Sequence, residues 1–122
     1  MSIDVLFQTS FYHDFKQLGD LIMVRLEDAV MEIIINAGQS RSLCFEALHA
    51  ARQGEMEEAR NLLREADGYA RQAHHMQTKL IEQDAGEARQ PMTLIMVHAQ
   101  DHLMNSLLAR ELSEEIIHLY QR

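Results

Sequence analysis

The chain has 122 residues, of which 47% are hydrophobic and 25% are charged, and its formal net charge is -8. This length suits one domain, and the excess of acidic residues argues against binding nucleic acid through its phosphates. The longest apolar runs fall far short of the roughly 20 residues of a transmembrane helix, and the start of the chain lacks the basic region of a signal peptide. The only cysteine, Cys44, cannot form an intrachain disulfide. We therefore expect a soluble protein of the cytoplasm.

The first 25 residues differ from the rest because they hold most of the aromatic side chains. Apolar residues there are spaced four, four, three and four apart, namely Phe7, Phe11, Phe15, Leu18 and Ile22. This spacing fits one amphipathic helix, although Gly19 weakens the pattern. Two interpretations stay open: a short accessory helix, or an arm that settles only against its own oligomer. We treat 1–25 as an N-terminal extension and 26–122 as the domain.

Residues 26–122 carry the pattern of three long helices. Apolar residues recur at helical spacing from 26 to 51, from 56 to 81, and from 92 to the end. Gly54 and the stretch 84–86 are suitable helix ends, and Pro91 separates the second pattern from the third. Because the connections are short, the sequence predicts an all-α, antiparallel three-helix bundle.

Two stretches are apolar on more sides than one bundle can cover. They are the three isoleucines at 33–35 and the residues 94–97, Leu-Ile-Met-Val. We expect a second chain to cover them. Small residues on the first helix either let another helix approach closely or simply pack tightly inside the bundle; they are Ala37, Gly38, Ser40 and Ser42.

The segment 98–102, His-Ala-Gln-Asp-His, is the main candidate for chemistry. His98 and His102 are four residues apart and Asp101 lies three after His98, so a helix places all three on one side. Asp101 also falls where a coiled-coil pattern counted from Leu94 wants an apolar residue, and an ionisable group there needs a partner. If this helix lined a threefold axis, three copies of Asp101 would have to bind protons or a divalent cation.

Two other functional classes fit parts of this pattern. A His-x-x-x-His pair suits a transition metal, so a helical hydrolase could use His98, His102 and an acid from elsewhere. A non-catalytic helical adaptor could instead bind a partner through its acidic faces. The remaining histidines carry no comparable signal: His74 and His75 are consecutive and point about 100° apart, and His13, His49 and His118 are isolated among polar neighbours.

Four stretches of the chain resemble one protein family. They are 34–42 (Ile-Ile-Asn-Ala-Gly-Gln-Ser-Arg-Ser), 73–82, 84–87, and 97–104 (Val-His-Ala-Gln-Asp-His-Leu-Met). From about residue 26 to 120 the chain resembles the IIA component of the lactose/cellobiose class of the bacterial sugar phosphotransferase system, especially its N,N'-diacetylchitobiose and cellobiose members. Residues 1–25 fall outside the resemblance.

The resemblance implies a cytoplasmic phosphocarrier that assembles as a homotrimer and supports uptake of a β-linked disaccharide. It would take a phosphoryl group from phosphorylated HPr and pass it to a cysteine of the IIB component. By position, His98 matches the acceptor and Asp101 matches the metal-binding aspartate on the trimer axis, where we expect one Mg²⁺ per trimer. Gln100 and His102 match supporting residues. The chemistry suits these residues, since a neutral imidazole is nucleophilic near neutral pH and phosphoryl transfer needs mainly alignment and charge stabilisation.

Overall fold

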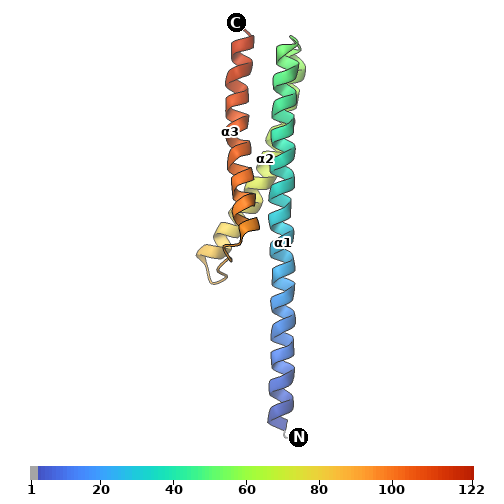
Figure 1. Ribbon diagram of the computed structural model, residues 1–122, viewed down its shortest axis with the longest axis vertical. Helices are drawn as coiled ribbons and strands as arrows, with labels where there is room; N and C mark the ends of the chain where they lie inside the picture. The colour runs from blue at the N-terminus through green and yellow to red at the C-terminus, as the bar shows by residue number, and fades with distance from the viewer. Residues whose placement is uncertain (1–2) are drawn as a thin grey trace.

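The structure is a computed structural model that describes the backbone of residues 3–122 and the side chains of residues 14, 16, 17 and 25–122. Every regular element in this described part is an α-helix: α1 (Ile3–Arg52), α2 (Met56–Ala85) and α3 (Leu94–Tyr120). The helices alternate in direction along the chain (Figure 1). The predicted all-α, three-helix subunit is therefore confirmed.

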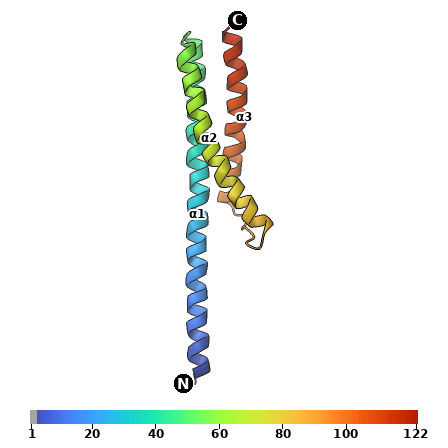
Figure 2. The same cartoon turned by 180° about the vertical axis from the view of Figure 1, so that it is seen from behind.

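The N-terminal extension is continuous with the first helix of the bundle. The sequence allowed a short separate helix before residue 26, whereas α1 runs from Ile3 through Gly19 to Arg52 without a break. At 1.5 Å per residue its 50 residues span about 75 Å, and its N-terminal part extends beyond the other two helices (Figures 1 and 2). The side chains of the aromatic pattern at 7–22 lie outside the described residues.

The turn between α1 and α2 forms at the predicted glycine. Gly54 has a φ of +84°, in the left-handed region that favours glycine. Its N–H donates to the carbonyl of Ala51 at 3.0 Å, and the N–H of Glu55 donates to that of Ala50 at 2.9 Å. These bonds satisfy carbonyls that the end of α1 leaves free, so the chain reverses here and α2 returns along α1.

Two side chains organise the connection that leads into α3. The carboxylate of Asp84 accepts the backbone N–H of Gln90 at 2.8 Å. Thr93 caps α3, because its hydroxyl accepts the N–H of Met96 at 3.2 Å. As a result α3 begins at Leu94, two residues after the start expected from the apolar pattern, and the segment 98–102 lies in its second and third turns.

The core follows α1 from Val30 to Ala51, because both other helices pack against α1, while α2 and α3 contact each other least. Figure 2 shows α2 crossing α1 and diverging near the α2–α3 connection. One buried cluster lies near the α1–α2 turn and includes Leu43, Cys44, Ala47, Ala59, Leu63 and Ile117. The other lies near the start of α3 and includes Val30, Ile33, Ala73, Leu80, Met96 and Leu103. The many alanines in both clusters let the helix backbones approach closely.

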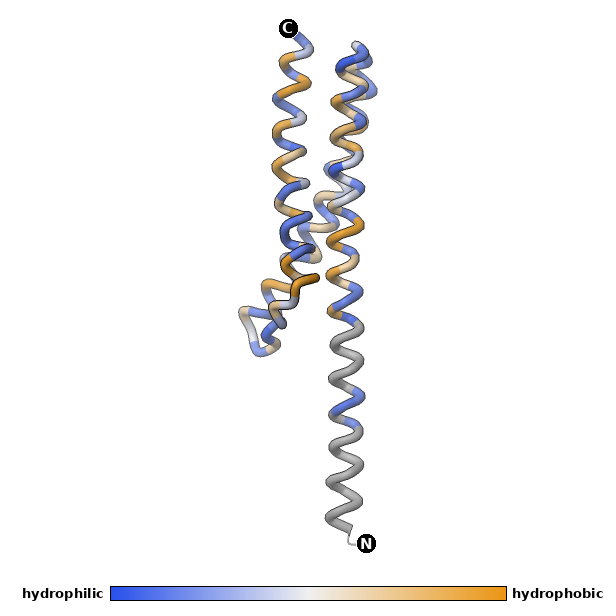
Figure 3. Tube along the Cα trace, viewed as in Figure 1, coloured by the Kyte–Doolittle hydropathy of each residue, from blue (hydrophilic) through white to orange (hydrophobic). Residues whose placement is uncertain are grey.

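One face of α3 stays apolar and uncovered in the subunit. This open face consists of Leu94, Val97, Asp101, Met104, Leu108, Leu112 and Ile116, all of which are exposed. On α1, Ile33 is fully buried but Ile35 remains 58% exposed. Figure 3 shows hydrophobic positions recurring along the whole of α3. The prediction that 33–35 and 94–97 leave apolar side chains outside a single bundle is thus confirmed. In the described part of the chain, no helix has an apolar stretch long enough to cross a bilayer.

Candidate functional site

The two histidines of the segment 98–102 touch each other on the surface of α3. Their Nε2 atoms are 3.1 Å apart, and the ring centroids are 4.4 Å apart with the ring planes at 85°. His98 is exposed and His102 is half-buried. When both rings are neutral, one facing nitrogen carries the proton and the other a lone pair. The contact therefore fixes the orientation of the His98 ring while leaving it accessible to a second protein.

Asp101 lies on the open face of α3, as the sequence pattern predicted. Its carboxylate accepts a hydrogen bond from the side-chain amide of Asn105 at 3.3 Å. Asp101, His102 and Asn105 also line a pocket of about 220 Å³ that is completed by Arg41 of α1. We call it the Arg41 pocket. The structure thus adds a cation from another helix that the search for site residues did not single out, although it belongs to the similar stretch 34–42.

Gln100 points away from the two histidines. Its amide oxygen accepts a hydrogen bond from the amide of Gln77 on α2, and its amide nitrogen contacts the sulfur of Met96 at 3.7 Å. A residue two positions after His98 is turned by about 200° around the helix. Within one subunit, therefore, Gln100 joins α3 to α2 and does not share the face of His98.

A metal site is incomplete within one subunit. Among the described residues, the structure brings together no group of three His, Cys, Asp or Glu side chains that could hold an ion. Among the side chains that the structure describes, none supplies the acidic third ligand from another helix that the helical hydrolase would need beside His98 and His102. Asp101 supplies a single carboxylate, whose oxygens suit a hard divalent cation. It would form a cation site only together with other copies of the chain.

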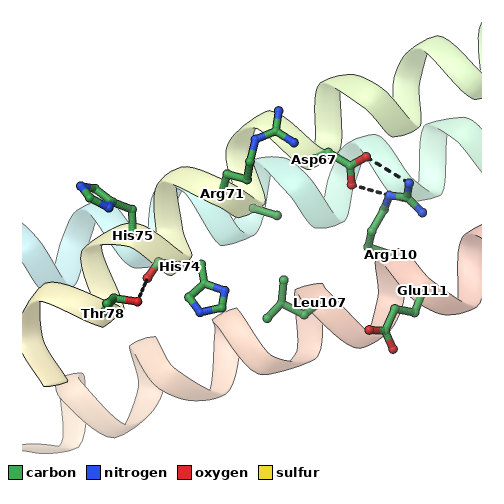
Figure 4. A pocket seen from close by; sticks show the side chains of 9 residues that line it. Asp67, Arg71, His74, His75, Thr78, Leu107, Arg110 and Glu111 are labelled. Atoms are coloured by element: carbon green, nitrogen blue, oxygen red, sulfur yellow. Dashed lines mark hydrogen bonds and ion pairs between the residues drawn. The ribbon is translucent and has the colours of Figure 1, made fainter.

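A second hollow lies between α2 and α3, with a volume of about 690 Å³. Figure 4 shows Asp67 and His74 of α2 facing Arg110 and Leu107 of α3 across it. The Arg110 guanidinium binds both carboxylate oxygens of Asp67, at 2.6 and 3.0 Å. This paired contact ties two helices that otherwise touch little. Its residues are 43 positions apart, so sequence spacing gave no signal for it.

Cys44 of α1 is a buried titratable residue close to the Asp67–Arg110 pair. Burial raises the pKa of the Cys44 thiol, and the nearby Arg110 guanidinium opposes that shift only in part. The pKa of Arg110 is raised in turn by its hydrogen bond to Asp67. Cys44 is fully buried, so the thiol stays protonated at neutral pH and acts as a small apolar side chain of the core.

Comparison with known proteins identifies the family. Residues 28–121 match the model of the family described as PTS system, Lactose/Cellobiose specific IIA subunit. The chain belongs to this family. The matched residues hold nearly all of the described bundle and the whole segment 98–102, while most of the N-terminal extension lies outside the match.

Individual relatives support the assignment over the same region. The chain is 50% identical over 97 residues to the N,N'-diacetylchitobiose-specific EIIA component of Escherichia coli, covering 80% of this chain and 84% of that one. It is 45% identical over 97 residues to the lichenan-specific enzyme IIA component of Bacillus subtilis, covering 80% and 88% of the two chains.

Among solved structures, the fold is similar to that of IIA(chitobiose) in its solution complex with HPr from Escherichia coli. The TM-score is 0.70 at 49% identity, covering 79% of this chain and 93% of that one. The IIA subunit is thus a phosphoryl carrier of the sugar phosphotransferase system, in the class whose members serve lactose, cellobiose and chitobiose.

Proposed function

We propose that His98 is the phosphoryl acceptor of this IIA subunit, that phosphorylated HPr is its donor, and that a cysteine of the cognate IIB component receives the group next. The exposed His98 ring at the start of α3 carries this proposal. The IIA(chitobiose)–HPr complex of the 49%-identical relative supports HPr as the donor. No other histidine of the described helices combines exposure, a fixed ring and a place in the segment 98–102.

The transfer requires little machinery beyond this positioned nucleophile. A lone pair on the His98 ring forms a bond to phosphorus while the bond between phosphorus and the donor breaks, and that electron pair stays with the donor. In the second transfer the bond to His98 breaks in turn and its electron pair returns to the ring. Because an imidazole is both nucleophile and leaving group near neutral pH, the relay is reversible and needs no nucleotide.

His102 and Gln100 have different supporting roles. His102 orients the acceptor, since its Nε2 lies 3.1 Å from that of His98. The hydrogen bond between these two nitrogens determines which nitrogen of the His98 ring holds the lone pair. Gln100 acts through the fold, because its bond to Gln77 joins α2 to α3 at the level of the acceptor. We therefore assign Gln100 a positioning role and not that of a phosphate ligand within its own subunit.

We further propose that three subunits assemble around the open face of α3. That face runs for most of the helix and exposes large apolar side chains, including Met104, Leu108 and Leu112. An exposed apolar stripe of this length is typical of a surface covered by another chain. A threefold axis along it brings equivalent helices together in a closed assembly.

This arrangement accounts for the one carboxylate on the open face. Three copies of Asp101 meeting at an axis repel one another unless they bind protons or a cation. We propose that one divalent ion, Mg²⁺ in our assignment, is held by the three carboxylates and supplies the neutralising charge. In this proposal the ion stabilises the assembly of subunits and takes no part in the phosphoryl transfer, which proceeds on His98.

The transported sugar belongs, in this proposal, to the β-linked disaccharide class that the relatives serve. Their names include N,N'-diacetylchitobiose and lichenan systems. A phosphocarrier passes on phosphorus and needs no sugar-binding pocket of its own, so the choice of sugar rests with other components of the system.

The decisive experiment incubates the protein with phosphoenolpyruvate, enzyme I and HPr, and maps the phosphohistidine by mass spectrometry. We expect the label on His98, and complete loss of labelling in His98→Ala with helicity and assembled mass unchanged. His118→Ala is the matched control, because His118 is an exposed histidine near the far end of the same helix. Full labelling of the His98→Ala protein would refute the acceptor assignment.

A further inference from the structure

We propose that Arg41 binds the phosphoryl group while His98 carries it. This inference rests on the proposed acceptor and adds a charge-stabilising residue from α1. It starts from the Arg41 pocket, which Arg41 shares with three residues of α3. The pocket adjoins the acceptor, because His102 both lines it and lies within 3.1 Å of the His98 ring.

The charges around this pocket explain why a cation is needed. A phosphoryl group brings roughly two negative charges to the surface of α3. Of the four residues that line the pocket, only Arg41 carries a permanent positive charge. A guanidinium can donate two parallel hydrogen bonds to neighbouring phosphoryl oxygens. Arg41 is therefore the group of this pocket suited to stabilise phosphorylated His98.

The charge of Arg41 is also available for such a role. In the described part of the chain it makes no ion pair, and its guanidinium lies over the ring of Phe45, 5.7 Å from the ring centroid. This contact orients the side chain without neutralising it. Arg110, in contrast, is paired with both Asp67 and Glu114, and Arg52 contacts the His49 ring.

A group that binds the attached phosphoryl group shifts the equilibrium of transfer, whereas a group that only docks HPr does not. The equilibrium constant between phosphorylated HPr and the phosphorylated IIA subunit depends on the stability of the two phosphorylated forms and not on the affinity of their complex. One charge-assisted contact with the phosphoryl oxygens is worth about a factor of ten. The effect of Arg41 should therefore appear in this constant.

The test compares Arg41→Gln with Arg52→Gln, since both arginines are exposed residues of α1. Purified phospho-HPr is mixed with each protein, and the labelled fractions are followed to equilibrium. We expect Arg41→Gln to lower the equilibrium constant and the forward rate about tenfold, with wild-type values for Arg52→Gln. Arg41→Lys should recover part of the loss because the charge remains. Titration of unphosphorylated HPr should give the same affinity for all four proteins.

The outcomes separate this inference from the proposed acceptor. A wild-type equilibrium constant in Arg41→Gln overturns the role of Arg41 even if His98→Ala still abolishes labelling. A loss that appears only in the affinity for HPr overturns it as well and makes Arg41 a docking residue. A change in helicity or in assembled mass with the constant unaltered makes it structural. Labelling that survives in His98→Ala refutes the acceptor itself, and with it this inference.

Discussion

The two faces of α3 have similar composition and different surroundings. Its inner face, which includes Met96, Ala99, Leu103 and Ile117, is buried against the rest of the bundle. Its open face carries side chains that are just as apolar, such as Leu108 and Leu112, and each is more than half exposed. The apolar side chains of this helix therefore form two sets. Folding of one subunit buries the inner set and leaves the set on the open face exposed. His98 and Asp101 belong to the outward part of the helix, so in the proposed function the chemistry lies on the side where assembly and partner binding take place.

Leu108→Glu is the substitution that should break the proposed assembly completely. It places three carboxylates in an apolar interface, and such uncompensated charges are not tolerated there. We expect the mass in solution, measured by analytical ultracentrifugation, to fall from that of a trimer to that of one subunit, with the helical circular dichroism kept. Gln72→Glu adds the same charge at an exposed position of α2 and should leave the mass unchanged. A trimer that persists in Leu108→Glu would show that the open face is not the interface.

Adjacent residues on the two faces should give different kinds of stability loss. Leu103 is fully buried, so Leu103→Ala should lower the free energy of unfolding by about 3 kcal/mol at every protein concentration. Met104 is 56% exposed in the subunit, so Met104→Ala should weaken mainly the assembly, and its effect should shrink on dilution. Urea unfolding at two concentrations measures both. Equal, concentration-independent losses would remove the distinction between the faces.

Asp101→Leu should sharpen the comparison by making the open face uniformly apolar. We expect the variant to lose bound Mg²⁺ and to remain a trimer that is more stable by about 1–4 kcal/mol, because packing replaces buried charge. Metal analysis and thermal unfolding test this result. Asp101→Asn is the control, since it removes the charge without supplying an apolar side chain. Dissociation of Asp101→Leu into single subunits would instead indicate an assembly that depends on the ion.

The smallest expected effect is on the pH dependence of stability and comes from the buried thiol of Cys44 on α1. The pKa of Cys44 is raised in the folded protein. Above roughly pH 8.5, which is the ordinary pKa of a cysteine, the unfolded chain therefore loses the thiol proton before the folded protein does. The folded state is thereby disfavoured, and stability should fall with rising pH by at most about 1.4 kcal/mol per unit. The slope of unfolding free energy between pH 8 and 10 should be shallower in Cys44→Ala. Identical slopes in the two proteins would contradict the raised pKa.

The fold was predictable because the signals for it are local. Apolar residues at helical spacing gave the three helices of the bundle, Gly54 marked the α1–α2 turn, and the excess of apolar residues at 33–35 and 94–97 gave the uncovered surfaces. The exception is the start of α1, where one of the two interpretations, a separate short helix, was wrong because α1 is continuous from Ile3. Gly19 weakens a helix by about 1 kcal/mol, which is too little to end one that continues on both sides.

The site was predictable only where its residues are neighbours in sequence. His98 and His102 are one helical turn apart, so their contact follows from spacing. The placement of Gln100 did not follow, because the resemblance suggested a group near the phosphorylated ring and the structure turns it toward Gln77. Arg41 was part of a similar stretch, but nothing in the sequence indicated that it lines the same pocket as Asp101.

By itself the sequence determined the helices, the turn glycine, the family, and the line of residues that includes Asp101. The helices, the turn glycine and that line of residues follow from backbone preferences and from periodicity, which act over a few residues, whereas the family follows from the resemblance of four stretches of sequence. The tertiary structure decided which side of α3 is covered, which amide binds Gln100, and which cation lines the same pocket as Asp101. Those choices depend on how helices far apart in the chain pack against one another, and no local preference encodes the distance between their side chains.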